Sequence, residues 1–521
     1  MRRVPAAAVA AVTLAAVVSV TSPAEALENG QARTPPMGWN TWNTFECNIN
    51  ETLVKQTTDL MVSSGMRDRG YTYVNLDDCW MTWSRDADGN LVADPAKFPS
   101  GLKALGDHIH ARGMKFGIYA DAGTMTCQGF PGSLGHEQAD ANLFASWGVD
   151  YLKYDNCHNS DSTQQDYIRR YSAMRDALQA TGRPITYSIC EWGYFDPATW
   201  APDVGNLWRT TGDITNNWGS IAAIYHQNVE LAPAAKPGAW NDPDMLEVGN
   251  GMAFREDRAH FTLWAAMAAP LIAGADLRAA SVAAFSTYLD PDVIAVDQDP
   301  LGKQATRISS GDGLDVLAKP LQDGEVAVVL FNETGSPRTV STTAAAAGLP
   351  AAASYRLTNL WSKELTTSGG TISATVPSHG TVIYRVAPGS GSSIGTTQPL
   401  RGASSARCID VNGASVDIWD CDGRTEQAWT FTGAGELRAD GRCLDAQGGT
   451  SGTKLVASTC HGGANQQFKL EADGSITQAG LCVDVTGGNK PAGNVNGTPL
   501  ELWTCHDDAN QNWSLEQLKS R

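Results

Sequence analysis

The chain has 521 residues, a net charge of −18, 42% hydrophobic residues and 18% charged residues. This length predicts several domains, and the hydrophobic content argues against global disorder. The acidic balance argues against nucleic acid as a partner, because phosphate binding needs clustered Lys and Arg. The composition therefore favours a globular protein that handles uncharged ligands.

The N-terminus has the pattern of a secretory signal peptide, which we place at residues 1–26. Arg2 and Arg3 precede an Ala/Val-rich run over 6–20, and Ala-Glu-Ala at 24–26 offers a cleavage site. A membrane anchor is the weaker alternative, since a bilayer span needs ~20 apolar residues. We therefore expect a secreted, extracellular protein with no membrane partner.

The chain contains 11 Cys. An exported protein with this many cysteines is expected to form disulfides. Six cysteines form regular pairs near the C-terminus, namely Cys408/Cys421, Cys443/Cys460 and Cys482/Cys505. Cys190 is left over, and we expect it to be a buried free thiol. Because no His/Cys cluster has metal-ligand spacing, we expect neither a metal nor a cofactor.

Residues 27–304 alternate short β-rich runs with longer amphipathic segments, such as 138–147 and 166–178. This alternation over ~250 residues predicts a (β/α)8 TIM barrel rather than an open sheet. The eight expected strands are Met37–Trp42, Tyr73–Leu76, Lys115–Ala120, Tyr151–Tyr154, Ile185–Ile189, Asn206–Thr210, Ala239–Asn241 and Leu271–Ala273.

Polar or aromatic residues follow seven of these eight strands. Barrel active sites lie at the C-terminal ends of the strands, so these residues should share one mouth. They are Asn40, Thr41 and Trp42, Asp77 and Asp78, Tyr119 and Asp121, Lys153 and Asp155, Glu191 and Trp192, Arg209 and Asp213, and Asp242 and Asp244.

The sequence pattern changes after the predicted barrel. Residues 305–387 contain short β-rich runs between Gly/Ser/Thr turns, which predicts a supporting antiparallel β-domain. Residues 388–399 are rich in Gly, Ser, Thr and Pro and are expected to form a flexible linker.

The segment 400–521 contains an internal repeat. CIDV at 408, CLDA at 443 and CVDV at 482 each precede a Gln-x-aromatic motif. Three β-rich copies that cannot bury their faces alone predict a threefold β-trefoil. The aromatic residues of the motif, Trp429, Phe468 and Trp513, are expected in its core.

Paired acids at a barrel mouth suggest glycoside cleavage, which needs one nucleophile or base and one acid. Alternation along the strand 151–155 places Lys153 and Asp155 on the same side, facing the mouth. We expect Lys153 to keep Asp155 ionised. A surface salt bridge is the competing interpretation.

Asp213 lies just beyond the sixth strand. A general acid needs a raised pKa, which we expect partial burial near Asp155 to supply. A helix N-cap is the alternative. Asp77 with Asp78, or Asp242 with Asp244, remain open as the catalytic pair.

From about residue 29 to 385 the chain resembles glycoside hydrolase family 27, the α-galactosidase (melibiase) family. The resemblance rests on TPPMGWNTW (34–42), YVNLDDCW (73–80), FGIYAD (116–121), YLKYDNC (151–157), CEW (190–192), WRTTGDI (208–214) and WNDPDML (240–246). It implies a TIM barrel followed by an antiparallel β-sandwich.

The resemblance also implies roles. Asp155 is then the nucleophile of a retaining double displacement, and Asp213 is the acid/base. Asp77 and Asp78 would read the 4- and 6-hydroxyls of galactose. The remaining implied substrate-binding residues are Trp42, Tyr119, Lys153, Glu191, Trp192, Arg209 and Asp244. The implied disulfides are Cys47–Cys79 and Cys127–Cys157.

Glu191 bears on specificity. Family members that act on α-N-acetylgalactosaminides carry smaller residues at its position, so the resemblance implies a substrate with a free 2-hydroxyl. Other members act on β-L-arabinopyranosides, and the intact pair of Asp77 and Asp78 favours galactose over these.

The last 120 or so residues resemble ricin-B-like family 13 carbohydrate-binding modules. The third repeat carries the full set implied for a sugar site, namely Asp484, Trp503, Asn510 and Gln511. The first has Asp410, Trp419 and Gln427, but Glu426 stands where Asn is expected. The second has Ser458 in place of the aromatic and is expected to be weak or structural.

The sequence therefore predicts an exo-glycosidase that releases terminal α-D-galactosyl groups from oligo- or polysaccharides through a covalent galactosyl-enzyme. The alternatives are a β-L-arabinopyranosidase and, from another class, a secreted lectin with an inactive barrel. The oligomeric state is left open.

Overall fold

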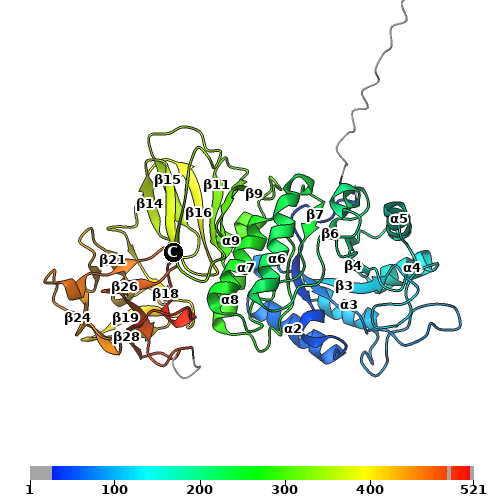
Figure 1. Ribbon diagram of the computed structural model, residues 1–521. Helices are drawn as coiled ribbons and strands as arrows, with labels where there is room; N and C mark the ends of the chain where they lie inside the picture. The colour runs from blue at the N-terminus through cyan, green and yellow to red at the C-terminus, as the bar shows by residue number, and fades with distance from the viewer. Residues whose placement is uncertain (1–25, 28, 490–493, 517–521) are drawn as a thin grey trace, which may run out of the picture.

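The computed structural model describes residues 26–27, 29–489 and 494–516, and these form three successive parts (Figure 1). The predicted signal peptide lies, except for Ala26, outside the described residues. A curled parallel sheet comes first, an antiparallel β-domain second and a module of short antiparallel strands third. This order confirms the predicted fold class of TIM barrel, β-sandwich and β-trefoil.

The barrel sheet has the strand order β7-β6-β5-β4-β3-β2-β1-β8, with every pairing parallel. Leu246, just beyond β7, forms a parallel bridge with Ala273 of β8 and so closes the ring. The strands are β1 (Met37–Asn40), β2 (Tyr73–Asn75), β3 (Lys115–Asp121), β4 (Tyr151–Asp155), β5 (Thr186–Ile189), β6 (Leu207–Arg209), β7 (Trp240–Asp242) and β8 (Leu271–Ala273).

Several of the barrel helices begin where a side chain caps their free N–H groups. Asn50 accepts a hydrogen bond from the Leu53 N–H, and Thr163 accepts one from the Asp166 N–H. The helices are α1 (Trp42–Phe45), α2 (Glu51–Ser63), α3 (Leu102–His110), α4 (Glu137–Trp147), α5 (Gln164–Ala180), α6 (Trp218–Asn228), α7 (Phe254–Ala266), α8 (Val282–Tyr288) and α9 (Pro291–Asp297).

The β-domain packs against the barrel through α7, which lies between them (Figure 1). Its six-stranded sheet has the order β14-β13-β16-β11-β10-β9, and β12 pairs with β15 in a second sheet. The strands are β9 (Thr306–Gly311), β10 (Leu314–Pro320), β11 (Val326–Asn332), β12 (Arg338–Thr343), β13 (Tyr355–Asn359), β14 (Leu365–Ser368), β15 (Thr371–Val376) and β16 (Gly380–Pro388).

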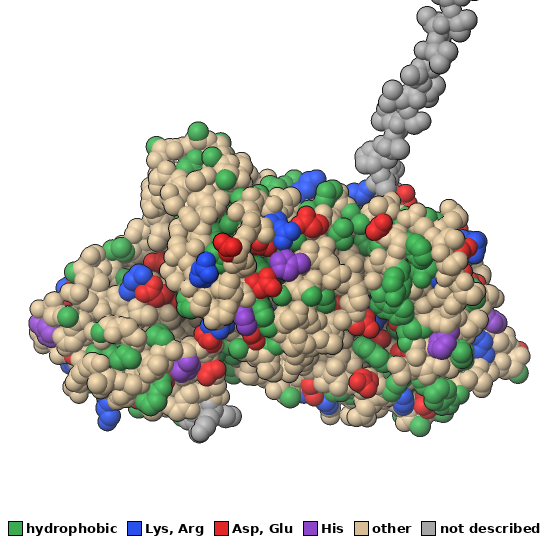
Figure 2. Space-filling view, in the orientation of Figure 1, with side chains coloured by type: hydrophobic (Ala, Val, Ile, Leu, Met, Phe, Trp, Pro, Cys, Tyr) green, Lys and Arg blue, Asp and Glu red, His purple; other side chains and the backbone are tan. Residues whose placement is uncertain are grey.

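Charged and histidine side chains gather where α6 meets the β-domain (Figure 2). Arg307 of β9 pairs with Glu230 and with Asp315, and His226 of α6 pairs with Glu333. The pairs of Arg307 with Glu230 and of His226 with Glu333, together with the contact between Tyr225 and Phe331, join the two domains.

The trefoil buries one core, which contains Trp429, Phe468 and Trp513 as expected from the repeat. The indole N–H groups of Trp429 and Trp513 donate to the carbonyls of Ile409 and Val483. The strands are β17 (Thr397–Gln398), β18 (Leu400–Gly402), β19 (Cys408–Asn412), β20 (Ser415–Trp419), β21 (Trp429–Phe431), β22 (Leu437–Ala439), β23 (Arg442–Ala446), β24 (Thr453–Ser458), β25 (Lys469–Leu470), β26 (Ile476–Gln478), β27 (Leu481–Val485), β28 (Thr498–Thr504) and β29 (Trp513–Leu515).

The segment 388–399, expected to be a flexible linker, lies against both of its neighbours. The Ser393 N–H donates to the Leu365 carbonyl at 2.8 Å, and the Gly395 N–H donates to the Phe431 carbonyl at 2.7 Å. Its backbone therefore joins β14 to β21 through hydrogen bonds.

The trefoil also contacts the other two domains directly. Arg258 of α7 donates to the Asn512 side chain at 2.5 Å, and Arg255 pairs with Asp507. The Asn359 amide donates to the Ala472 carbonyl at 2.7 Å. The three domains thus meet around the N-terminal end of α7.

Candidate active site

A cavity of about 460 Å³ opens at the C-terminal ends of the barrel strands. It is lined by residues that follow seven different strands, as the sequence predicts for a barrel mouth. The predicted site residues that line it are Trp42, Asp77, Asp78, Tyr119, Lys153, Asp155, Trp192, Arg209, Asp213 and Asp244. Glu191 does not line it.

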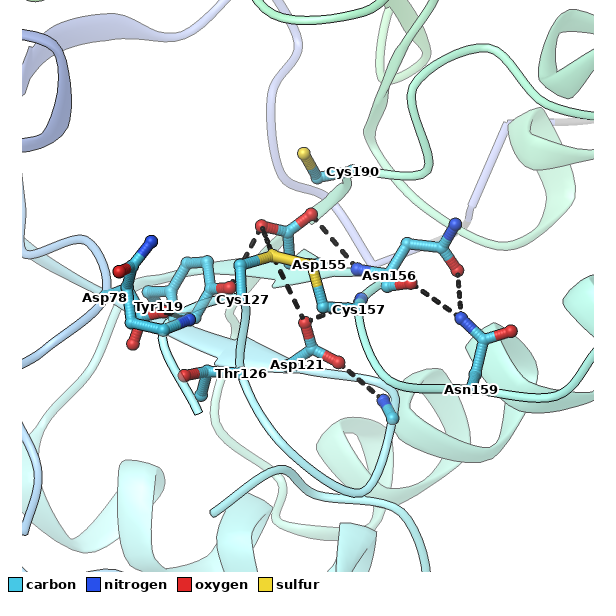
Figure 3. The surroundings of a disulfide bond; sticks show 12 residues. Asp78, Tyr119, Asp121, Thr126, Cys127, Asp155, Asn156, Cys157, Asn159 and Cys190 are labelled. Carbon is cyan, nitrogen blue, oxygen red and sulfur yellow. Dashed lines mark hydrogen bonds between the residues drawn. A yellow bond between two sulfur atoms is a disulfide. The ribbon is translucent and has the colours of Figure 1, made fainter. Parts of the chain in front are cut away.

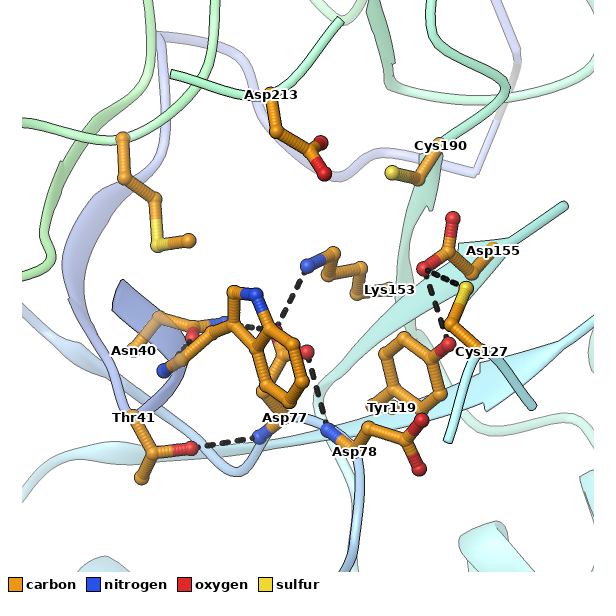
Figure 4. A network of polar contacts seen from close by, with 12 residues as sticks. Asn40, Thr41, Asp77, Asp78, Tyr119, Cys127, Lys153, Asp155, Cys190 and Asp213 are labelled. Carbon is orange, nitrogen blue, oxygen red and sulfur yellow. Dashed lines mark hydrogen bonds and ion pairs between the residues drawn. The ribbon is translucent and has the colours of Figure 1, made fainter. Parts of the chain in front are cut away.

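Asp155 ends β4 and is 6% exposed. The Tyr119 hydroxyl donates to its Oδ2 at 2.9 Å, and the Asn156 N–H donates to its Oδ1 at 3.0 Å. Burial raises the pKa of Asp155, and the charge of Lys153 acts in the opposite direction. Figure 4 shows Asp155 and Asp213 pointing toward the same space.

The disulfide Cys127–Cys157 braces the segment that follows Asp155 (Figure 3). Asp121, the neighbour of Asp155 in the β3–β4 register, lies beneath it and accepts hydrogen bonds from the N–H groups of Gly123 and Cys157. Burial, and next the charge of Asp155, raise the pKa of Asp121 to about 8. The charge of Asp155 therefore favours the protonated form of Asp121.

Lys153 bonds primarily to Asp77 rather than to Asp155. Its Nζ lies 2.8 Å from Asp77 Oδ2, which also accepts the Asn40 amide at 2.8 Å (Figure 4). The Thr41 hydroxyl in turn accepts the Asp77 N–H. This network fixes the carboxylate of Asp77 at the floor of the cavity. The charge of Lys153 also acts to lower the pKa of Asp155, in the direction that the sequence predicts.

Asp78 is held by backbone groups. Its carboxylate accepts the N–H groups of Cys79 at 2.6 Å and Gln128 at 3.1 Å. Burial raises its pKa to about 6. Both loops that hold Asp78 carry disulfide cysteines, since Cys79 pairs with Cys47 and Gln128 follows Cys127.

Asp213 lies on the loop after β6, and its side chain is 66% exposed. Arg209 Nη2 lies 3.0 Å from Asp213 Oδ1 and 2.8 Å from Asp244 Oδ2. The surrounding protein shields Asp213 in part from water and so pushes its pKa upward, but the Arg209 guanidinium outweighs this effect and the pKa is lowered. The expectation of a raised pKa for Asp213 is therefore wrong for the free protein.

The side chains of Glu191 and Trp192 lie on different sides of the barrel wall. Ser188 and Cys190 face the barrel interior, so alternation turns Glu191 outward and Trp192 back toward the mouth. Glu191 is fully buried, and the backbone N–H groups of Gly193 and Tyr194 are the polar groups next to its carboxylate. Burial raises its pKa to about 8.

Several residues of the cavity were missed in the sequence. Cys190 is a buried free thiol, as expected; it does not line the cavity, but its Sγ lies 3.7 Å from Nη1 of Arg209, which does. Glu247 and Met245 also line the cavity, and Glu247 accepts the Asn43 amide at 2.5 Å. The motif 240–246 and strand alternation were the available signals for Met245 and Cys190.

Two clusters among the described residues have the composition of metal sites. They are Asp121 with Cys127 and Cys157, and Glu436 with Cys443 and Cys460. In each cluster the two cysteines form a disulfide, so neither offers a thiolate ligand. The other disulfides join Cys47 to Cys79, Cys408 to Cys421 and Cys482 to Cys505.

The trefoil repeats share a buried Asp–Gln pair. Gln427 donates to Asp410 at 3.0 Å, Gln466 to Asp445 at 2.8 Å and Gln511 to Asp484 at 2.7 Å. In the third repeat Asn510 also donates to Asp484 at 2.8 Å, and Trp503 is 43% exposed. In the first repeat Arg424 contacts Asp410 where the expected Asn is missing.

Acids on facing sides of one polar cavity are what cleavage of a glycosidic bond requires. The fold and the site together therefore define a (β/α)8-barrel glycoside hydrolase. Residues 34–299 match the family described as alpha galactosidase A, and residues 311–386 match the alpha galactosidase C-terminal beta sandwich domain. The chain belongs to glycoside hydrolase family 27, the α-galactosidase (melibiase) family. Residues 396–513 match the ricin-type beta-trefoil lectin domain.

Relatives and solved structures agree with this family. An alpha-galactosidase of Cyamopsis tetragonoloba is 49% identical over 364 residues, which are 69% of this chain and 88% of that protein. An alpha-N-acetylgalactosaminidase of Gallus gallus is 40% identical over 391 residues, 70% of this chain and 95% of that protein. The crystal structure of alpha-galactosidase I from Mortierella vinacea superposes with a TM-score of 0.68 at 38% identity, covering 70% of this chain and all of that one.

Proposed function

We propose that the protein is a retaining exo-α-galactosidase that acts on galactosylated oligo- or polysaccharides. The observation that carries the proposal is that Asp155 and Asp213 line one cavity at the mouth of a family 27 barrel. Asp155 attacks the anomeric carbon while Asp213 protonates the departing oxygen. Asp213 then takes a proton from the water that releases galactose from Asp155.

The environments of the two acids support different roles. Asp155 is buried and held by Tyr119 and Asn156, which fixes its attacking oxygen. Asp213 is exposed and bonded to Arg209, which lowers its pKa in the free protein. A bound leaving group covers Asp213 and removes its water, so binding itself raises the pKa of the acid.

The floor of the cavity supports a sugar with hydroxyls at positions 4 and 6. Asp77 and Asp78 present fixed carboxylate oxygens, and each such oxygen can accept hydrogen bonds from a sugar hydroxyl. Lys153 donates beside them. Trp42 and Trp192 supply apolar surface on the walls for a pyranose ring.

The decisive experiment is proton NMR during hydrolysis of p-nitrophenyl α-D-galactopyranoside. Retention predicts α-galactose as the first product, before mutarotation. Asp155→Ala should abolish turnover. Release of β-galactose first, or full activity of the Asp155 variant, would contradict the mechanism.

Two other specificities are tested with the same protein. Members of this fold act on β-L-arabinopyranosides, and a relative is named for N-acetylgalactosaminides. We expect kcat/KM for p-nitrophenyl α-galactoside to exceed that for either aryl analogue by at least about tenfold. A higher value for the arabinopyranoside would move the assignment to that substrate.

We further propose that the protein is secreted and that its trefoil binds sugar. Five disulfides among the described residues support an oxidising compartment, and no described helix is long and apolar enough to cross a membrane. No nucleic-acid or membrane partner is expected. A lectin with an inactive barrel is excluded if Asp155→Ala loses turnover but still binds galactomannan.

A further inference from the structure

Tyr194 is an exposed aromatic residue next to the active-site wall. Its side chain is 53% exposed, and its ring meets that of Trp192 edge-on at a centroid distance of 6.1 Å. Trp192 lines the cavity, whereas Tyr194 lies beyond its lining. The aromatic wall therefore continues from the cavity onto the surface.

The loop that carries Tyr194 is held in an unusual backbone conformation. Trp192, Phe195 and Asp196 have φ angles of 58°, 58° and 52°, a region that bulky residues rarely adopt. The Phe195 carbonyl accepts hydrogen bonds from Gln164 at 2.9 Å and from the Trp200 indole at 3.1 Å. These contacts fix the loop with the tyrosine ring outside.

The same loop packs against the segment that leads to the acid/base residue. A Cβ on Gly193 would lie 2.4 Å from the carbonyl oxygen of Thr210, so the two backbones are in close contact. Thr210 follows β6 and is three residues from Asp213. Tyr194 therefore lies on the side of the mouth where Asp213 is anchored.

The chemistry places the leaving group on that side, because the acid must reach the oxygen that departs. We propose that Tyr194, which extends the aromatic wall beyond Trp192, forms a binding surface for the sugar residue released from galactose. An aromatic ring offers an apolar face to the C–H groups of a pyranose. The substrate class is then galactosides whose leaving group is itself a sugar, and this inference rests on the proposed function.

The test compares two substrates with the full chain. Melibiose leaves a glucose, and methyl α-D-galactopyranoside leaves only methanol. Tyr194→Ala should lower kcat/KM for melibiose about five- to tenfold and change that for the methyl glycoside less than twofold. Tyr194→Phe should keep both values, because it retains the ring.

Trp83→Ala is the matched control. Trp83 is 72% exposed, but it stacks on Phe130 with a centroid distance of 4.1 Å, so one of its faces is already covered. Its removal should leave the ratio of the two kcat/KM values unchanged. The inference is overturned if Tyr194→Ala lowers both values equally or neither. If the unsubstituted protein hydrolyses neither glycoside, the proposed function itself has failed.

Discussion

Replacing Glu191 by Gln should stabilise the protein at neutral pH and have little effect near pH 4. Burial raises the pKa of this carboxyl from 4.5 to about 8. Between these two values the unfolded chain loses a proton that the folded chain keeps, so the stability that Glu191 contributes is present below pH 4.5 and falls as the pH rises toward 8. At pH 7 the loss is about 3 kcal/mol.

The assay is calorimetry of the variant at pH 4 and pH 7. A gain of about 3 kcal/mol corresponds to a rise of roughly 6–12 °C in the Tm of a domain of this size. Asp68→Asn, at a side chain that is 67% exposed, is the control and should give no pH-dependent gain. Equal Tm shifts at the two pH values, or a lower Tm at pH 7, would refute the reasoning.

Three further predictions concern other parts of the site and the trefoil. Removing the Cys127–Cys157 disulfide by double substitution to Ala should lower stability by about 4 kcal/mol, from the loop of 30 residues it closes, as measured by denaturant unfolding. Because a bound leaving group covers Asp213, the alkaline limb of kcat should lie at higher pH than that of kcat/KM, and coincident limbs would contradict this. Trp503→Ala should weaken retention on galactomannan about tenfold in affinity electrophoresis while hydrolysis of p-nitrophenyl galactoside is unchanged; unaltered retention would remove the third repeat as a sugar site.

The fold was predictable because hydrophobic runs indicate the strands and turn residues indicate where they end. Leu271–Ala273 has the same bounds in the sequence and in the structure, and the other barrel strands differ by one or two residues. Met37–Trp42 ends earlier than expected, since α1 begins at Trp42. Boundaries of this kind depend on backbone turns that a run of apolar residues does not specify.

The membership of the site was more predictable than its electrostatics. Residues at strand ends converge by the geometry of a barrel, which places Asp155 and Asp213 at one cavity. Lys153 of β4 pairs with Asp77, which follows β2, and Arg209 pairs with Asp213 four residues later in the chain. A linear pattern contains neither distance, so the direction of the Asp213 pKa could not be derived from it.

For Glu191, by contrast, the alternation of side chains along the strand is enough to predict where the side chain points. Alternation from Ser188 through Cys190 turns the next side chain away from the mouth. The resemblance to the family drew attention to Glu191, whereas only Trp192 of this segment lines the cavity.

The contacts of Arg255 and Arg258 with the trefoil hold this module against α7. A module on a loose tether samples many separations, and its gain in local concentration depends on the length of that tether. A module seated on α7 instead holds its proposed sugar sites at one fixed offset and angle from the barrel mouth. Under the proposed function, branches spaced to match that offset are cleaved without release of the polymer, whereas a polymer with another spacing must dissociate and bind again.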